Sequence, residues 1–185
     1  VEETSIEDAK YQFEVNIFGL ARLTQLIIPH MRKQQAGKII NISSVGGKIY
    51  TPLGAWYHAT KHALEGWSDS LRLELKQFNI DVVIIDPGAI ATEFGDVMVK
   101  PMLERSGNGP YKAMAQSMAK TDTESYDTPG GSSPSSVISD VIAKAIDSQQ
   151  PRTRYAVGKL AKPILFMRRF LSDRAFDRTI MSRVS

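Results

Sequence analysis

The sequence contains no cysteine among its 185 residues, so disulfide bonds and thiolate metal sites within the chain are excluded. It has no apolar run close to the ~20 residues that cross a bilayer. Its net charge is only +3, which is too small to indicate a nucleic-acid partner. These absences favour a globular protein with about one domain over residues 1–185, for which we expect a cytoplasmic location.

The first element that the sequence predicts is a long helix near the start of the chain. Thr4 and Glu7 have the spacing of a capping box, in which each side chain bonds a backbone N–H at the helix start. Apolar residues then recur with a helical period from Ile6 to Met31. Gly37 follows at the place where a left-handed residue typically ends a helix.

Buried strands are predicted at 38–43 and 81–86, where apolar residues are nearly consecutive, and a third strand is predicted at 154–158. A helix over about 55–78 separates the first two strands, and a helix over 134–148 has proline in its first turn. Continuous apolar strands joined by helices are typical of a parallel sheet covered on both faces. The sequence therefore predicts an α/β fold.

The segment over about 93–136 has a different composition. Its first part, 93–120, contains methionine and aromatic residues and predicts one or two short helices. Its second part, 121–136, is rich in Ser, Thr, Gly and Pro and predicts a loop. Methionine suits an adaptable apolar wall, but the same residues can simply pack this segment onto the sheet.

Tyr57 and Lys61 are four residues apart in the predicted helix, so both side chains project from one helix face. Ser44 lies thirteen residues before Tyr57, at the end of a predicted strand. A free tyrosine titrates near pH ~10 and is a poor acid or base at neutrality, but a neighbouring cation lowers its pKa. The Ser44 hydroxyl can bind the same substrate oxygen as the phenol. The three residues together predict proton-transfer chemistry.

These residues belong to motifs that resemble those of the short-chain dehydrogenase/reductase superfamily. The serine segment is Asn41–Gly47, the Tyr-x-x-x-Lys motif is Tyr57–Lys61, and a Pro-Gly-x-Ile-x-Thr motif lies within 86–92. Asn16 lies twenty-eight residues before the second serine and matches the helical asparagine of the family. The four elements occur in the family's order, and the resemblance extends over roughly 4–158.

The resemblance implies a catalytic role for four residues. Tyr57 is the expected general acid/base, and Ser44 is expected to bind the substrate oxygen. Lys61 would bind the nicotinamide ribose and lower the pKa of Tyr57. Asn16 would hold a water molecule that connects Lys61 to solvent. The expected substrate is a small alcohol or carbonyl compound.

The resemblance also implies a nicotinamide cofactor, either NADP or NAD, of which NADP is favoured. Open α/β sheets bind ligands at the carboxyl ends of their strands, where Ser44 and Pro87 both fall. Relatives place a substrate-covering lid at 93–136, so its methionines favour a lipophilic substrate. The residues expected to bind the cofactor are Tyr57, Lys61, Pro87, Gly88, Ile90 and Thr92.

One element of the family pattern is absent from the sequence. No Gly-x-x-x-Gly-x-Gly run occurs, although the family uses such a turn to hold the cofactor pyrophosphate at a helix N-terminus. We therefore expect the chain to be the C-terminal two-thirds of a Rossmann-like, doubly wound parallel sheet. As an isolated polypeptide it is expected neither to bind the cofactor tightly nor to turn over substrate.

Alternative interpretations stay open at several positions. Tyr57 and Lys61 can be solvated neighbours on a helix surface, and Asn16 can be a structural amide bonded to nearby backbone. Gly88 can be a turn glycine and Thr92 a helix cap. For the protein as a whole, the alternative is a dinucleotide-sensing or scaffold protein that kept the fold without turnover.

Two other kinds of site are not favoured by the motifs. His58 and His62 lie one turn apart like a zinc pair, but the His-Glu-x-x-His order is missing. We therefore interpret them as surface histidines and expect no metal. Ser44 likewise lacks the Gly-x-Ser-x-Gly context of serine hydrolases.

The last segment, 159–185, is predicted to be a helical extension in which arginines are interleaved with aromatic and aliphatic residues. This pattern fits a basic amphipathic helix on a membrane surface or at a subunit contact. We favour a solvated basic face over a packed apolar one, with membrane contact as the alternative. The family resemblance also implies a homo-oligomer.

Overall fold

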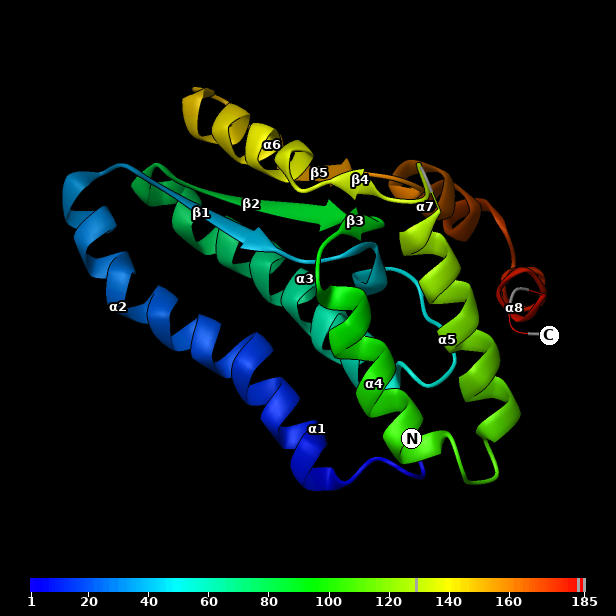
Figure 1. The fold of residues 1–185 in the computed structure, drawn as a ribbon. Helices are drawn as coiled ribbons and strands as arrows, with labels where there is room; N and C mark the ends of the chain where they lie inside the picture. The colour runs from blue at the N-terminus through cyan, green and yellow to red at the C-terminus, as the bar shows by residue number, and fades with distance from the viewer. Residues whose placement is uncertain (129, 183, 185) are drawn as a thin grey trace.

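The computed structural model describes residues 1–128, 130–182 and 184, and it has an α/β fold (Figure 1). Strand β1 (Gly37–Ile42) pairs in parallel with β2 (Ile80–Pro87), and β2 pairs in parallel with β5 (Arg154–Val157). Helices α2 and α3 lie on one face of this sheet and α6 lies on the other (Figure 1). The predicted parallel sheet with helices on both faces is therefore confirmed.

The remaining elements surround this sheet, and the hairpin of α4 and α5 extends from the end where the strand arrows point (Figure 1). In chain order they are α1 (Ile6–Phe13), the π-helix η1 (Glu14–Phe18), α2 (Gly19–Gln34), the 3₁₀ turn η2 (Val45–Gly47), α3 (Ala55–Leu75), the 3₁₀ turn η3 (Lys76–Phe78), β3 (Ile90–Ala91), α4 (Phe94–Ser106), α5 (Lys112–Asp127), β4 (Ser133–Pro134), α6 (Ser136–Asp147), α7 (Ala161–Phe170) and α8 (Asp173–Met181).

The core of the molecule lies between α3 and the sheet. On α3, Leu71 and Leu75 are buried and pack with Ile39 of β1 and with Ile80 and Val82 of β2. Consecutive residues of β2 are buried because helices cover both faces of the strand. This explains why the strand reads as a continuous apolar run in the sequence rather than as an alternating one.

Both predicted ends of the first helix need correction. Ser5, not Thr4, is the N-cap, because its side chain accepts a hydrogen bond from Asp8 N at 3.0 Å. At the other end, Gln35 takes the left-handed conformation with φ 52°, whereas Gly37 already begins β1. The prediction failed there because residues other than glycine can also adopt this conformation at a helix end, at a modest cost.

The predicted boundaries around 121–136 also need correction. Helix α5 continues to Asp127, into the segment predicted to be a loop. Pro134 does not start a helix, since it belongs to β4, which pairs in parallel with β3, and α6 begins only at Ser136. The Ser/Thr-rich composition did not reveal that the helix hairpin continues, because such residues are tolerated in helices.

The C-terminal helices match the predicted basic face over a packed apolar one only in part. Phe176 and Ile180 of α8 are buried against Ile49. On α7, by contrast, Phe166 and Phe170 are 66% and 65% exposed. Within the described residues, no helix is both long and apolar enough to cross a membrane. Residue 129 of the predicted lid and residues 183 and 185 of the predicted extension lie outside the described residues.

The burial of β2 gives a direct test of this core. Ile84→Ala should lower the free energy of unfolding by about 2–5 kcal/mol, because Ile84 is fully buried and the smaller side chain leaves a cavity. Ile146→Ala in α6 is the matched control, since Ile146 is 55% exposed. Urea unfolding followed by circular dichroism measures both variants, and equal losses would contradict the placement of the core.

Candidate active site

The carboxyl ends of β1 and β2 lie at the same edge of the sheet because the strands are parallel and in register, with Ile42 opposite Ile85. Ser43 extends this ladder, since its N–H donates to Ile85 O at 2.8 Å. Ser44 and Pro87 are therefore both placed at the strand ends, as the sequence predicted. This edge is where open α/β sheets bind ligands.

Tyr57 lies in the first turn of α3, half-buried against the segment that follows β1. Its ring packs against Phe94, with 5.6 Å between ring centroids. Gly46 lies so close that a Cβ there would come within 3.0 Å of Tyr57 Cε1. A glycine at this position therefore lets the serine segment approach the tyrosine ring.

Ser44 and Tyr57 interact through their hydroxyl groups. The Ser44 hydroxyl accepts a hydrogen bond from Gly46 N at 3.0 Å, which holds the side chain in place. Burial raises the pKa of Tyr57 above its usual 10, and a hydrogen-bonding interaction with the Ser44 hydroxyl lowers it in part. Lys61 is not among the groups that shift the pKa of Tyr57 in this structure, so the lowering expected from Lys61 stays a prediction.

Lys61 points toward the end of β1. Its Nζ donates to Ile42 O at 3.1 Å and lies 6.0 Å from the centroid of the Tyr57 ring. Burial lowers the pKa of Lys61, and the nearby Glu65 carboxylate opposes that shift. An ammonium group has three donors, so the one bond to Ile42 leaves Lys61 able to bind a further oxygen.

Asn16 lies in the π-helix η1 and contacts the same turn of α3. Its Nδ2 donates to Thr60 Oγ1 at 3.0 Å, and Thr60 Oγ1 donates to Tyr57 O at 2.8 Å. The structure thus shows a structural amide, whose partner is a side chain rather than backbone. Single-turn π-helices are frequent at functional sites, and here the wider turn carries Asn16 at its centre.

The Pro-Gly segment forms the other side of the site. Gly88 N donates to Val157 O at 2.9 Å, and a Cβ on Gly88 would collide with the Lys159 carbonyl oxygen. Ile90 is buried in β3. The Thr92 hydroxyl accepts from Phe94 N at 3.3 Å, although Glu93 rather than Thr92 is the N-cap of α4. Gly88 is therefore required by a close backbone approach.

A pocket of about 250 Å³ lies between this segment and the α4–α5 hairpin. Thr92, Asp96 and Val99 line it from one side, and Asp122 lines it from the other. Burial raises the pKa of Asp122 to about 6. The predicted lid thus lines the pocket beside Thr92 with the carboxyl groups of Asp96 and Asp122 as well as with the apolar side chain of Val99.

His58 belongs to the site, although the sequence predicted a surface histidine. It is buried rather than exposed, and its Nδ1 lies 2.9 Å from Gly46 O. Its Nε2 accepts a hydrogen bond from Thr51 N at 3.0 Å. The ring therefore fastens the loop between β1 and α3 to the turn that carries Tyr57. His62 is exposed, as predicted. No motif signals this role, because the loop partners are backbone atoms.

Comparison with known proteins agrees with this arrangement. The family model for short chain dehydrogenases matches residues 1–101. The chain is similar to the uncharacterized oxidoreductase YusZ of Bacillus subtilis, with 31% identity over 100% of this chain and 65% of that protein. It is also similar to a 3-ketodihydrosphingosine reductase of Bacteroides thetaiotaomicron, with 42% identity over 49% of this chain and 34% of that protein.

Among solved structures, a short-chain dehydrogenase from Streptomyces avermitilis superposes with a TM-score of 0.72 and 29% identity. The superposition covers 98% of this chain and 62% of that one. The chain therefore belongs to the short-chain dehydrogenase family. It spans less than two thirds of the length of each of these three proteins.

The His58 contacts predict a pH-dependent stability. Burial lowers the pKa of His58 below its usual 6.5, so the folded state favours the neutral ring. The stability from this group is complete above pH 6.5 and is lost as the pH falls through the lowered folded pKa. His58→Gln should reduce this acid-side loss of Tm, and it should cost about 1–3 kcal/mol at neutral pH because buried backbone groups lose their partners.

His62→Gln is the matched control, since this exposed ring lies one turn away on the same helix. Thermal unfolding between about pH 5 and pH 8 compares the variants across the histidine range. An unchanged pH dependence in His58→Gln would show that His58 does not hold the loop.

Proposed function

We propose that the protein is an oxidoreductase that interconverts an alcohol and a carbonyl compound, with a nicotinamide dinucleotide as hydride donor or acceptor. The single observation that carries this proposal is the meeting of Ser44, Tyr57 and Lys61 at the carboxyl end of β1. Membership of the short-chain dehydrogenase family supports it.

Tyr57 is proposed to transfer the proton to or from the substrate oxygen. Its phenol is half-buried and carries its proton at neutral pH, since burial raises its pKa. The Ser44 hydroxyl interacts with that phenol and can donate a hydrogen bond to the same oxygen. A fixed donor at this position stabilises the charge that develops during the reaction.

The residues beside Tyr57 fit a nicotinamide nucleotide, whose bound ring supplies or accepts the hydride. Lys61 has donors beyond its bond to Ile42 O and is placed to bind a ribose hydroxyl. The Thr92 hydroxyl and the backbone from Pro87 to Ile90 are proposed to hold the nicotinamide group. Ser44 and Tyr57 would then face the substrate.

Asn16 is proposed to support this site in two ways. Its amide nitrogen holds the turn of α3 through Thr60, and its amide oxygen is a further acceptor for a water molecule. Such a water would relay protons between Lys61 and solvent. In this proposal the structural role and the relay role of Asn16 are compatible, because they use different atoms of the amide.

A lipophilic carbonyl substrate is proposed from two observations. Phe94, 41% exposed, packs against Tyr57 and offers an apolar surface next to the reacting group. The similar Bacteroides protein is named a 3-ketodihydrosphingosine reductase. The lid methionines support the proposal less than expected, because Met102 is buried between α4 and α5 and Met118 packs against the same cluster.

The proton-transfer role of Tyr57 is tested by Tyr57→Phe in the full-length protein. The variant lacks only the phenolic oxygen, so kcat should fall about 10²–10⁴-fold while nicotinamide binding and thermal stability stay near those of the parent. A panel of ketones with NADPH and NADH provides the assay. Tyr11→Phe is the control, since Tyr11 is 72% exposed on α1. Turnover undiminished by Tyr57→Phe would refute the assignment and favour a non-catalytic protein.

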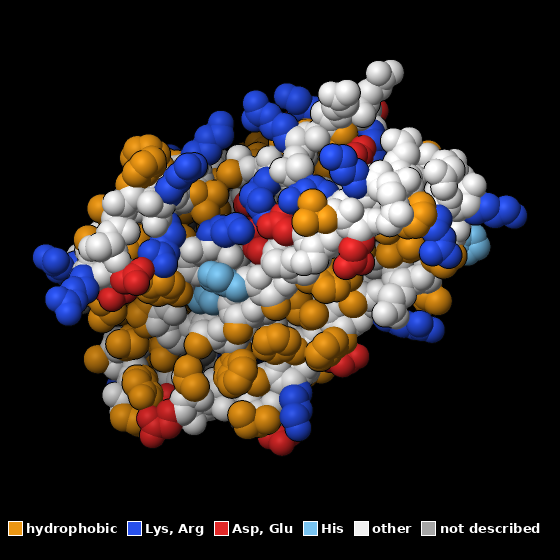
Figure 2. All heavy atoms as spheres, turned by 180° about the vertical axis from the view of Figure 1, so that it is seen from behind, with side chains coloured by type: hydrophobic (Ala, Val, Ile, Leu, Met, Phe, Trp, Pro, Cys, Tyr) orange, Lys and Arg blue, Asp and Glu red, His pale blue; other side chains and the backbone are white. Residues whose placement is uncertain are grey.

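We further propose that the protein is a homo-oligomer that uses the outer face of α1, η1 and α2. Large apolar side chains are exposed along it at Tyr11, Val15, Phe18, Leu23 and Leu26. Figure 2 shows the molecule from behind, where hydrophobic side chains gather over the lower half, but the stripe itself is defined by these five residues. An apolar stripe of this kind is typical of a protein contact.

A charge placed in this stripe should disrupt the assembly. Leu23→Glu removes a side chain that is 69% exposed and should shift the protein to a smaller species at micromolar concentration. Val97→Glu, at a 66% exposed position on α4, is the control. Size-exclusion chromatography with light scattering compares them, and an assembly that Leu23→Glu leaves intact would place the contact elsewhere.

A further inference from the structure

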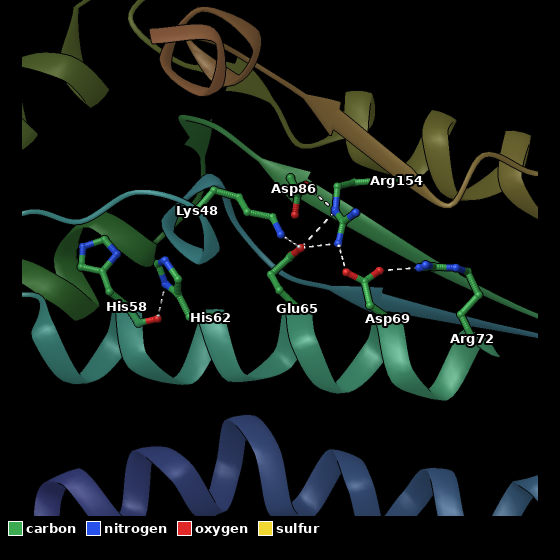
Figure 3. A network of polar contacts seen from close by, with 8 residues as sticks. All are labelled: Lys48, His58, His62, Glu65, Asp69, Arg72, Asp86 and Arg154. Atoms are coloured by element: carbon green, nitrogen blue, oxygen red, sulfur yellow. Dashed lines mark hydrogen bonds and ion pairs between the residues drawn. The ribbon is translucent and has the colours of Figure 1, made fainter. Parts of the chain in front are cut away.

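A network of charged side chains fills the space between α3 and the strands β2 and β5 (Figure 3). Glu65 Oε2 lies 2.6 Å from Arg154 Nη2 and 2.9 Å from Lys48 Nζ. Arg154 also contacts Asp69 at 3.1 Å and Asp86 at 3.5 Å. The network therefore links α3, the loop after η2, and the two strands.

Its two deepest members are carboxyl groups. Glu65 is 3% exposed and Asp86 is fully buried. Within the described residues, neither oxygen of Asp86 accepts a regular N–H or O–H hydrogen bond, and its contact with Arg154 is the longest in the network. Glu65, by contrast, forms ion pairs with both Arg154 and Lys48. Two buried carboxyl groups side by side do not both ionise, and the cations favour Glu65 as the ionised one.

The pKa shifts agree with this geometry. Burial and the neighbouring Glu65 carboxyl raise the pKa of Asp86 to about 8. The pKa of Glu65 is lowered, because its contacts with Asp86, Ser43 and Lys48 outweigh the effect of burial. At neutral pH the proton of the pair therefore resides on Asp86.

The pair is adjacent in the chain to residues of the candidate active site. Glu65 lies one helical turn after Lys61, and Asp86 immediately precedes Pro87. Ser43, whose hydroxyl lowers the pKa of Glu65, immediately precedes Ser44. Gly47 fits closely against the Glu65 side chain, because a Cβ there would come within 2.8 Å of Glu65 Cγ.

We propose that Glu65 is a positioning residue of the active site and acts as the ionised half of a carboxyl pair whose proton resides on Asp86. This proposal rests on the proposed oxidoreductase function. The Glu65 carboxylate holds the segments that carry Ser44 and Lys61 together with the end of β2. It also supports the charge on Lys61, whose pKa it raises against the effect of burial.

The charged groups that face Glu65 come from each element packed around it. They are Lys61 and Asp69 on α3, Lys48 after η2, Asp86 on β2 and Arg154 on β5. A pocket of about 320 Å³ beside Lys48, Asp86 and Arg154 is also lined by Arg168 and Arg169 of α7. The positive surroundings favour an ionised Glu65.

The test compares Glu65→Gln with Asp86→Asn in the full-length protein, assayed with NADPH or NADH and a panel of ketones. Asn is close in shape to the protonated Asp86 and can donate to Glu65 as the acid does, so kcat should stay within about twofold of the parent. Glu65→Gln removes the charge and should lower kcat about tenfold with a smaller change in KM. The high-pH limb of its kcat profile should also move to lower pH, because Lys61 loses its partner.

Asp69→Asn is the matched control, since Asp69 contacts the same arginine but its side chain is 36% exposed. It should leave kcat and the pH profile near those of the parent. A Glu65→Gln variant that folds and keeps the parent's kcat and pH profile would overturn the proposal. An Asp86→Asn variant as impaired as Glu65→Gln would overturn it as well.

Two readouts do not depend on activity and keep the charge state testable if no turnover is found. The infrared spectrum of the parent at neutral pH should contain a buried carboxylic acid carbonyl band that Asp86→Asn lacks. The contribution of Asp86 to stability should fall as the pH rises from 3.8 to about 8, because its folded pKa lies above its unfolded one. Asp86→Asn should remove that slope from Tm. An absent band, or an unchanged slope, would show that the proton is not on Asp86.

Discussion

The packing of α3 along β2 is the interaction on which the rest of the site depends. Buried leucines on α3 contact the sheet, and this contact places the first turns of the helix beside the carboxyl ends of β1 and β2. Tyr57 and Lys61 are carried by those turns, whereas Ser44 is carried by the strand end. Residues from separate segments are thus brought together by one apolar contact. Small displacements of α3 would separate the phenol from the hydroxyl.

The same contact also encloses polar groups, and their burial explains the direction of each pKa shift. Burial raises the pKa of Tyr57 and Asp86 and lowers that of His58 and Lys61, because each charged form is disfavoured in a poorly solvated place. Glu65 is the exception, since cations surround it. Burial therefore disfavours the charged forms of these four groups, whereas the cations around Glu65 favour its ionised form.

Much of this arrangement was predictable from the sequence. The spacing between Tyr57 and Lys61 fixed a shared helix face, and the apolar runs before Ser44 and Pro87 identified parallel strands that end at one edge. Contacts that depend on tertiary structure were not predictable. The burial of His58 depends on a loop backbone, and the pKa of Tyr57 depends on burial that a linear pattern does not report. The pairing of Glu65 with Asp86 joins residues that are far apart in the chain.

We propose that the protein transfers a hydride between a nicotinamide and a carbon atom while Tyr57 moves the proton. The most direct measurement is deuterium transfer from nicotinamide cofactor labelled at the transferable position, with the alcohol product analysed by mass spectrometry. We expect the full-length protein to place deuterium on the carbinol carbon, and this transfer to be largely lost when Tyr57 is replaced by phenylalanine. Product without deuterium, or equal transfer by both proteins, would contradict it.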